Sequence, residues 1–257
     1  MSATSSNIQF HLGAAFTILS IAAIIFLLVI LWETYSNDLE TNNRYFNDHD
    51  TSFQDISGRN LISICCTWGE ELVDGELTFM IIDESAGNNL DSVSSQTKGS
   101  YLQKNEAVYN AVEEWDLRIE GLTFREVQNR YDADIELRFR EGESEAAGLT
   151  NNLYDRFGLI TKSFVTIYER GFPFEFTDDQ TEQIVKHEIG HVLGLGHANF
   201  DNSLMSTHVH SGSGIISSCE SEAVYEANHW KLNQKEDGTN YYIYQPNSNF
   251  LECKSVI

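Results

Sequence analysis

The sequence predicts an α+β fold that lies behind a single membrane-spanning helix. Three observations favour this fold class: one long apolar segment near the N-terminus, short segments in which apolar and charged residues alternate, and segments with apolar residues at helical spacing. The chain has 257 residues, 41% of them hydrophobic, which is enough for one folded domain with extensions at its ends.

The first element is an apolar segment from Leu12 to Trp32 that contains no charged residue. A helix of this length spans roughly 30 Å, the hydrocarbon thickness of a bilayer. A buried helix of a soluble domain and a cleaved signal peptide are the alternatives. The segment has no basic start and no clear cleavage site, and it is longer than the apolar part of a signal peptide. We therefore expect an uncleaved single-pass anchor.

Few charges are available to determine the orientation of this anchor, because no Lys or Arg precedes Arg44. Acidic residues directly after the segment (Glu33, Asp38 and Glu40) favour an N-terminus on the inside. The bulk of the chain would then face the outside of the cell.

The rest of the chain divides into a polar segment, a folded domain and a C-terminal extension. Residues 33–60 are rich in Asn and Asp and show no periodicity, which is typical of a stalk. The predicted boundaries are 1–11 for a short tail, 12–32 for the anchor, 33–60 for the stalk, 61–232 for the folded domain and 233–257 for the extension.

Within the folded domain, strands and helices alternate in a way that predicts a layered α+β or α/β arrangement. In the segment 133–139, for example, Ile135, Leu137 and Phe139 alternate with charged residues. The elements expected first are a strand at 76–83, a helix at 101–121, strands at 122–127 and 133–139, a loop rich in Gly and Asn, and a strand at 158–169.

A second helix is predicted from Asp178 to about Leu193. Thr177 and Gln180 form a capping-box pattern, and the two aspartates that follow Thr177 suit the positive N-terminal end of a helix. Gly194 provides the stop. A loop over 201–218 and a last helix over 219–232 complete the domain.

This second helix carries the motif HEIGHVLGLGH, in which three histidines fall within eleven residues. His187 and His191 are four residues apart and so lie on one face of the helix. A left-handed Gly194 would reverse the chain and return His197 to the same point. Three imidazoles leave one position of a tetrahedral zinc for water, as in catalytic rather than structural sites.

Glu188 lies next to the first histidine and could accept a proton from a water at this site. Bound zinc lowers the pKa of its water to about 7 and polarises a carbonyl, which is the chemistry that peptide hydrolysis needs. The remaining histidines, at positions 11, 49, 208, 210 and 229, have no ligand spacing, and we expect them to be ordinary surface residues.

The motif HEIGHVLGLGH resembles the HExxHxxGxxH signature of the metzincin zinc peptidases. The segment "AVEEWDLRIEGLTFREV", the strand that follows it and the last helix "ESEAVYEANHW" are similar to the matrixin branch, over about residues 64–232. The resemblance implies a twisted mixed sheet with an active-site helix and a C-terminal helix. It implies zinc ligation by His187, His191 and His197, catalysis by Glu188, and a methionine turn at Met205 beneath the metal.

The resemblance also implies that a peptide substrate lies extended against an edge strand within 147–154. It further implies that the loop after Met205 walls the pocket on the primed side. The chain departs from vertebrate matrixins in two respects. No histidine lies between His49 and His187 to build a second zinc site, and no cysteine motif for propeptide latency is present.

The function predicted from these features is a membrane-anchored zinc endopeptidase acting on protein or peptide substrates. Two alternatives stay open: a non-catalytic surface receptor or adhesion module that retains a metal site, and a zinc hydrolase of non-peptide substrates. The net charge of −23, from 39 acidic and 16 basic residues, disfavours nucleic acid as a partner because phosphate binding needs a basic surface.

Acidic clusters at 132–134, 141–145 and 178–179 could supply oxygen ligands to Ca²⁺, although none has the EF-hand spacing. The four cysteines, Cys65, Cys66, Cys219 and Cys253, suit one or two disulfides outside the cell, with three connectivities possible. We expect the adjacent Cys65 and Cys66 not to bond to each other.

Overall fold

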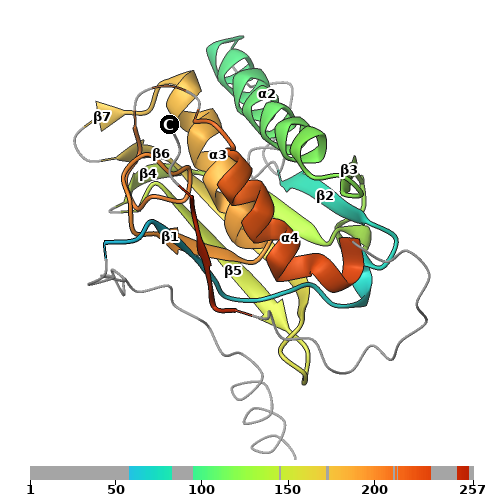
Figure 1. Ribbon diagram of the computed structural model, residues 1–257. Coiled ribbons are helices and arrows are strands. Elements are labelled where there is room, and N and C mark those ends of the chain that lie inside the picture. The colour runs from blue at the N-terminus through green and yellow to red at the C-terminus, as the bar shows by residue number, and fades with distance from the viewer. Residues whose placement is uncertain are drawn as a thin grey trace, which may run out of the picture. The chain divides into compact units, whose positions relative to one another are not determined.

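A mixed β-sheet with helices packed against it forms the centre of the fold in the computed structural model (Figure 1). The structure describes residues 58–82, 95–144, 146–171, 174–210, 212, 214–232 and 248–254, all within the unit Tyr45–Ile257. Among the helices of these residues, none is both long and apolar enough to cross a membrane. The predicted anchor at 12–32 lies outside the described residues, as does nearly all of the predicted stalk.

The larger sheet has the strand order β3-β2-β4-β6-β5, and a short strand β7 pairs with β6. Strands β3, β2, β4 and β6 run parallel to one another, whereas β5 and β7 are antiparallel to β6. The sheet is therefore mixed, as expected. Its strands are β2 (Glu76–Ile82), β3 (Thr123–Glu126), β4 (Ile135–Ser144), β5 (Gly148–Tyr154), β6 (Ile160–Gly171) and β7 (Phe174–Glu175).

A second, smaller sheet has the order β8-β1-β9 and is antiparallel throughout. It consists of β1 (Leu61–Ile64), β8 (Leu195–Ala198) and β9 (Phe250–Glu252). Part of the predicted C-terminal extension thus packs on the first strand of the domain. Cys253 bonds to Cys219 and so ties this extension to the start of the last helix.

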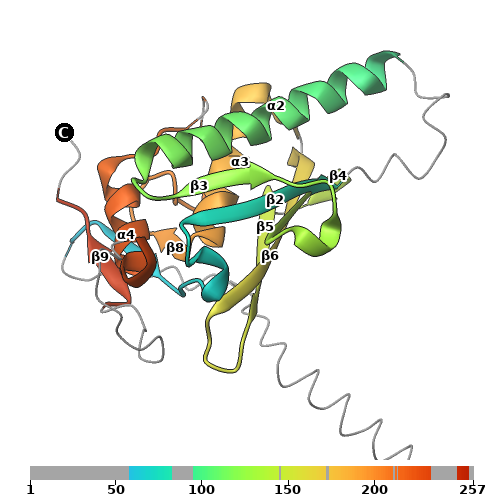
Figure 2. The same ribbon diagram turned by 90° about the vertical axis from the view of Figure 1, so that its right-hand side faces the viewer.

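Three α-helices accompany the sheets: α2 (Ser95–Arg118), α3 (Asp178–Val192) and α4 (Ser218–Leu232). Two 3₁₀ turns, η1 (Glu70–Leu72) and η4 (Arg130–Asp132), lie in connections. Figures 1 and 2 show α2 and α3 side by side over the sheet, and the indole N–H of Trp115 on α2 donates to the Lys186 carbonyl of α3 at 3.0 Å. Helix α2 begins six residues before the predicted start at 101.

The core lies between the helices and the larger sheet. Alternation in β4 predicts its inward side chains correctly: Ile135 and Leu137 are buried, and Phe139 packs against the core. Glu136 between them is buried too, because Arg130 and Lys162 bind its carboxylate at 2.8 and 2.9 Å.

Two expectations about this region were wrong. The Gly/Asn loop expected from the residue pattern before β6 is instead the strand β5, because seven residues pair with β6 along its edge; the resemblance to metzincins had implied an edge strand within 147–154, and β5 agrees with that expectation. Cys65 bonds to its neighbour Cys66. Strand β1 ends at Ile64, so neither cysteine lies within a strand. The backbone at the two cysteines can therefore form the turn that a disulfide between adjacent residues requires.

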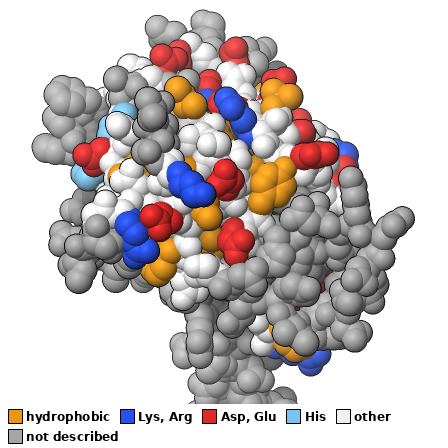
Figure 3. All heavy atoms as spheres, viewed as in Figure 1, with side chains coloured by type: hydrophobic (Ala, Val, Ile, Leu, Met, Phe, Trp, Pro, Cys, Tyr) orange, Lys and Arg blue, Asp and Glu red, His pale blue; other side chains and the backbone are white. Residues whose placement is uncertain are grey.

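Acidic and basic side chains both lie on the face seen in Figure 3, some of them next to one another. Ion pairs among the described residues include Arg125 with Glu76 at 2.8 Å.

Candidate metal centre

Helix α3 positions the first two histidines of the motif. Its N-terminus has the predicted capping box: the Gln180 amide donates to the Thr177 hydroxyl at 3.3 Å, and the Thr177 amide donates to the Gln180 side chain at 3.0 Å. His187 and His191 are one turn apart further along, and their Nε2 atoms lie 3.0 Å from each other. The predicted shared face of the helix is therefore confirmed.

The chain reverses directly after this helix, at Gly194, whose φ is 93°. A Cβ at this position would lie 2.2 Å from the Cys66 carbonyl oxygen, so both the backbone angle and the space require glycine. Strand β8 then pairs antiparallel with β1 and carries His197 back toward the helix. One nitrogen from each of the three imidazoles lies within 4.8 Å of the others, as the spacing predicts.

Side chains of neighbouring segments donate to three carbonyl groups at the C-terminal end of α3, where the helix itself supplies few donors. The Asn152 amide on β5 donates to the His191 carbonyl at 3.2 Å. The Trp68 indole donates to Val192 at 2.8 Å, and the Asn228 amide on α4 donates to Leu193 at 2.8 Å. The end of α3 that bears the histidines is thus fixed from three elements.

Backbone carbonyls orient two of the rings. His187 Nδ1 lies 2.7 Å from the Leu204 oxygen, and His191 Nδ1 lies 2.8 Å from the Leu195 oxygen. A carbonyl oxygen only accepts, so Nδ1 carries the proton and Nε2 keeps its lone pair. This is the arrangement of metal-ligating histidines, in which the second nitrogen donates to a fixed oxygen.

The His191 ring is also held in its neutral form. Desolvation by the surrounding protein, together with the proximity of His197, lowers the pKa of His191 to about 4, although the Leu195 carbonyl acts in the opposite direction. A neutral imidazole is the form that binds a metal ion.

The donor set fits zinc. Neutral imidazole nitrogen is a preferred zinc ligand, and two nitrogens on one tetrahedral zinc lie about 3.3 Å apart. The Nε2 atoms of His187 and His191, 3.0 Å apart, come close to this separation. Within the described part of the chain, the three histidines are the one group of such donors close enough to share an ion.

Glu188 is buried beside this group, with 4% of its surface exposed. The Thr150 hydroxyl on β5 donates to Glu188 Oε2 at 2.6 Å. Gly148 on the same strand leaves the space for the carboxylate, because a Cβ there would lie 2.4 Å from Glu188 Oε1. The acidic side chain of the motif therefore faces the edge strand, beside His187.

Met205 is fully buried and lies under α3. Its sulfur would be 2.4 Å from a Cβ at Gly190, so the thioether packs directly against the helix between the first two histidines. The turn that carries Met205 is held by Glu220 of α4, a buried carboxylate that accepts from the Ser203 hydroxyl at 2.6 Å and from the Leu204 amide at 3.0 Å. Met205 thus packs against α3 at Gly190, and its role as a methionine turn beneath a bound metal stays a prediction.

Three residues of this region escaped prediction from the sequence: Thr150, Glu220 and Lys186. The ammonium of Lys186, 2% exposed, lies 2.5 Å from Glu114 of α2 and 2.7 Å from Glu182 of α3. Nothing in the sequence sets these three apart from ordinary polar residues, since each depends on a partner distant in the chain. Lys186 does have a local partner, Glu182 four residues earlier on the helix, but this spacing is also common on exposed helix faces.

The other predicted features lie apart from the triad. His208 is exposed and lies 3.1 Å from the Thr207 hydroxyl, and the described side chains bring neither it nor His210 into the metal-binding group. Of the acidic clusters, Asp134 binds the Thr78 amide at 2.7 Å, and Asp178 accepts from Gln103 at 3.3 Å. Calcium binding stays a prediction.

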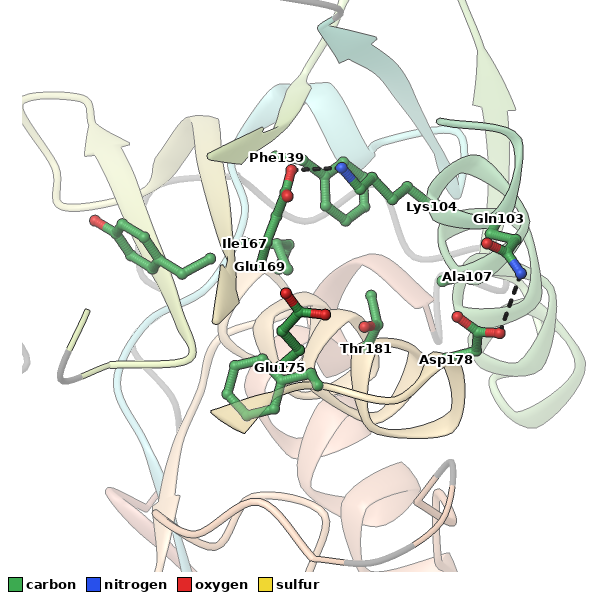
Figure 4. Close-up of a pocket in the computed structure, with 11 residues that line it drawn as sticks. Gln103, Lys104, Ala107, Phe139, Ile167, Glu169, Glu175, Asp178 and Thr181 are labelled. Atoms are coloured by element: carbon green, nitrogen blue, oxygen red, sulfur yellow. Dashed lines mark hydrogen bonds and ion pairs between the residues drawn. The ribbon is translucent and has the colours of Figure 1, made fainter. Parts of the chain in front are cut away.

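A pocket of about 260 Å³ lies near the N-terminal end of α3, and neither the three histidines nor Glu188 nor Met205 lines it (Figure 4). Its polar side chains include two pairs, Lys104 with Glu169 and Gln103 with Asp178. The histidines at the other end of α3 are therefore the stronger candidate for chemistry.

The model of the matrixin family of peptidases matches residues 88–218, half of the chain. The chain belongs to the matrixin family. This match contains all three histidines and Glu188, and it agrees with the arrangement of α2, the sheet and α3.

An archaemetzincin from Sulfolobus acidocaldarius is also similar, with 33% identity over 102 residues. The aligned part covers 36% of this chain and 53% of that protein, so the chain spans about half the length of this relative. Both comparisons point to the metzincin class of zinc peptidases, and both are consistent with a zinc metallopeptidase.

Proposed function

We propose that this protein is a zinc-dependent endopeptidase that hydrolyses peptide bonds in proteins or peptides. The observation that carries the proposal is the convergence of three imidazole nitrogens within 4.8 Å, with the buried Glu188 beside them. Membership of the matrixin family supports the same reaction.

In this proposal His187, His191 and His197 hold the zinc ion. Bound zinc supplies Lewis acidity, which polarises the scissile carbonyl and acidifies a water. Two of the three rings are oriented by the carbonyls of Leu204 and Leu195, so the ligands need little rearrangement to bind a metal.

Glu188 is the proposed general base. Its carboxylate accepts the proton of the attacking water, and the same oxygen then gives that proton to the departing amine nitrogen as the C–N bond breaks. Burial between α3 and β5 keeps this carboxylate in one place and limits its contact with bulk water.

The substrate is proposed to lie along β5. This strand ends the order of the larger sheet, and among the described strands it pairs with β6 alone. An extended peptide can add to such an edge through main-chain hydrogen bonds. Gly148 and Thr150 of β5 contact Glu188, so a peptide on this edge would lie beside the proposed base.

The test is a panel of quenched fluorescent peptides incubated with the full-length protein, with and without a chelator. We expect cleavage that chelation abolishes and zinc restores. Glu188→Ala should lower kcat/KM by about 10²–10⁴-fold while zinc content, measured directly, stays at one ion per chain. Zinc binding without turnover of any peptide would contradict the proposal and favour a receptor or a hydrolase of other substrates.

Residues 12–32 are proposed to anchor the protein in the cell membrane with the peptidase domain outside, on the basis of the uncharged apolar segment. Extraction of membranes at high pH tests this: an anchored chain stays with the lipid. Protease added to intact cells should remove the peptidase domain. Release at high pH, or protection from protease, would contradict the anchor or its orientation respectively.

A further inference from the structure

The face of β5 that looks toward α3 contacts the motif helix at every second residue. Side chains two residues apart on a strand lie on the same face, so Gly148, Thr150 and Asn152 form one row. Gly148 makes room for the Glu188 carboxylate, and Asn152 binds the His191 carbonyl. Thr150 lies between them.

The Thr150 hydroxyl is near two oxygens of Glu188: Oε2 at 2.6 Å and the backbone carbonyl at 3.1 Å. A hydroxyl has one hydrogen, and the shorter contact, to the carboxylate oxygen, is the stronger bond. Because threonine is branched at Cβ, its side chain has few rotamers, and the direction of the hydroxyl is well defined.

A glutamate side chain has three rotatable bonds, and a general base must lie within hydrogen-bond reach of the proton that it removes. Glu188 is held at one carboxylate oxygen by Thr150, while its other oxygen lies against Gly148, in the space that a side chain at that position would fill. These two contacts come from one rigid strand, so they restrict the carboxylate to a narrow range of positions.

We propose that Thr150 is a positioning residue that holds Glu188 in the orientation needed for proton transfer. This inference rests on the proposed peptidase function. Thr150 acts through Glu188 and does not itself touch the reacting atoms, so its removal changes the rate of the chemical step more than the binding of substrate.

The experiment compares four full-length proteins loaded with zinc: the wild type, Thr150→Val, Thr150→Ser and Thr161→Val. Valine has the shape of threonine without the hydroxyl, and serine keeps the hydroxyl. Thr161→Val is the matched control. It makes the same change on the neighbouring strand β6, where the hydroxyl lies 3.5 Å from the Leu153 carbonyl. For each protein, kcat and KM for one quenched peptide, zinc content and melting temperature are measured.

We expect Thr150→Val to lower kcat by about 10–100-fold with KM changed by less than about twofold. Thr150→Ser should retain kcat within about threefold of the wild type, and Thr161→Val within about twofold. Zinc content should stay at one ion per chain in all four proteins.

A wild-type kcat in Thr150→Val would overturn the inference, and so would a loss in Thr150→Ser as large as in Thr150→Val. A loss of zinc in Thr150→Val would also overturn it, because the residue would then support the metal site and not Glu188. In each of these cases the active wild type leaves the proposed function standing. A wild type that cleaves no peptide contradicts the proposed function and this inference together.

Discussion

Two glycines of the motif lie directly against groups from other segments of the chain. Gly194 takes a positive φ and lies against the Cys66 carbonyl, whereas Gly190 lies against the Met205 sulfur. The sequence signature predicts the turn at Gly194. The role of Gly190 depends on where Met205 lies in space, and this could not be read from spacing along the chain.

Gly190→Ala is expected to destabilise the protein by about 1–3 kcal/mol, because the added methyl group overlaps the Met205 thioether in a fully packed region. The free energy of unfolding from urea titration measures this. The double variant Gly190→Ala/Met205→Ala should lose less than the sum of the single variants, since truncation of Met205 opens the space. Additive losses would show that the two residues are not in contact.

At the scale of elements, α3 is joined to its neighbours by buried polar contacts as well as by apolar packing. Lys186 links α3 to α2 through Glu114, and Glu220 links the methionine turn to α4. The capping box and the histidine face of α3 follow from local patterns and were predictable. These long-range contacts were not predictable, because lysine and glutamate are usually exposed and the sequence does not identify the distant partners of Lys186 and Glu220.

Lys186→Met is expected to lower the free energy of unfolding by about 3–5 kcal/mol. The variant leaves the carboxylates of Glu114 and Glu182 close together without the ammonium that lies between them. Chemical denaturation measures the change. Arg118→Ala is the control: it removes a half-exposed cation 3.9 Å from Glu114 and should cost less than about 1 kcal/mol. Equal losses in the two variants would contradict this account of Lys186.

Glu136 of β4 makes stability depend on pH. Burial raises the pKa of its carboxyl, but the bonds from Arg130 and Lys162 outweigh this and lower the pKa overall. A lowered pKa in the folded state means that the contribution is present above the ordinary pKa of glutamate. It is lost as the pH falls through the folded-state pKa.

Glu136→Gln should therefore be less stable than the wild type by about 1–2 kcal/mol at neutral pH, since Arg130 and Lys162 are partly exposed and their attraction is screened. The difference should shrink as the pH is lowered below the ordinary range of a glutamate. Unfolding free energies measured from neutral pH down to pH ~3 test this. A difference that stays constant or grows toward acid pH would contradict it.

For the whole molecule, periodicity and motif spacing predicted the α+β class, the order of most elements and the place of the three histidines. They did not predict β5, because glycine and two asparagines interrupt its sequence GLTNNLY and it becomes a strand by pairing with β6. They also did not predict the pairing of β9 with β1 or the connectivity of the cysteines. The β1–β9 pairing and the Cys219–Cys253 bond join segments far apart in the chain, which no local pattern reports.

The two disulfides should differ in their effect on stability. Cys219 and Cys253 are 34 residues apart, so their bond restricts the unfolded chain, and Cys219→Ser/Cys253→Ser should cost about 3–4 kcal/mol. The bond between Cys65 and Cys66 joins adjacent residues, so it hardly restricts the unfolded chain. Cys65→Ser/Cys66→Ser should therefore lower the free energy of unfolding markedly less. Thermal unfolding of the two double variants measures this, and an equal loss would contradict the chain-entropy explanation.

X-ray absorption spectroscopy of the zinc-loaded full-length protein tests the central claim, that His187, His191 and His197 bind one ion and leave a position for water. We predict three imidazole nitrogens and one further light atom at about 2.0–2.1 Å, with one imidazole lost in His197→Ala. Two imidazoles in the wild type, a fourth protein ligand, or an unchanged spectrum in His197→Ala would contradict the claim.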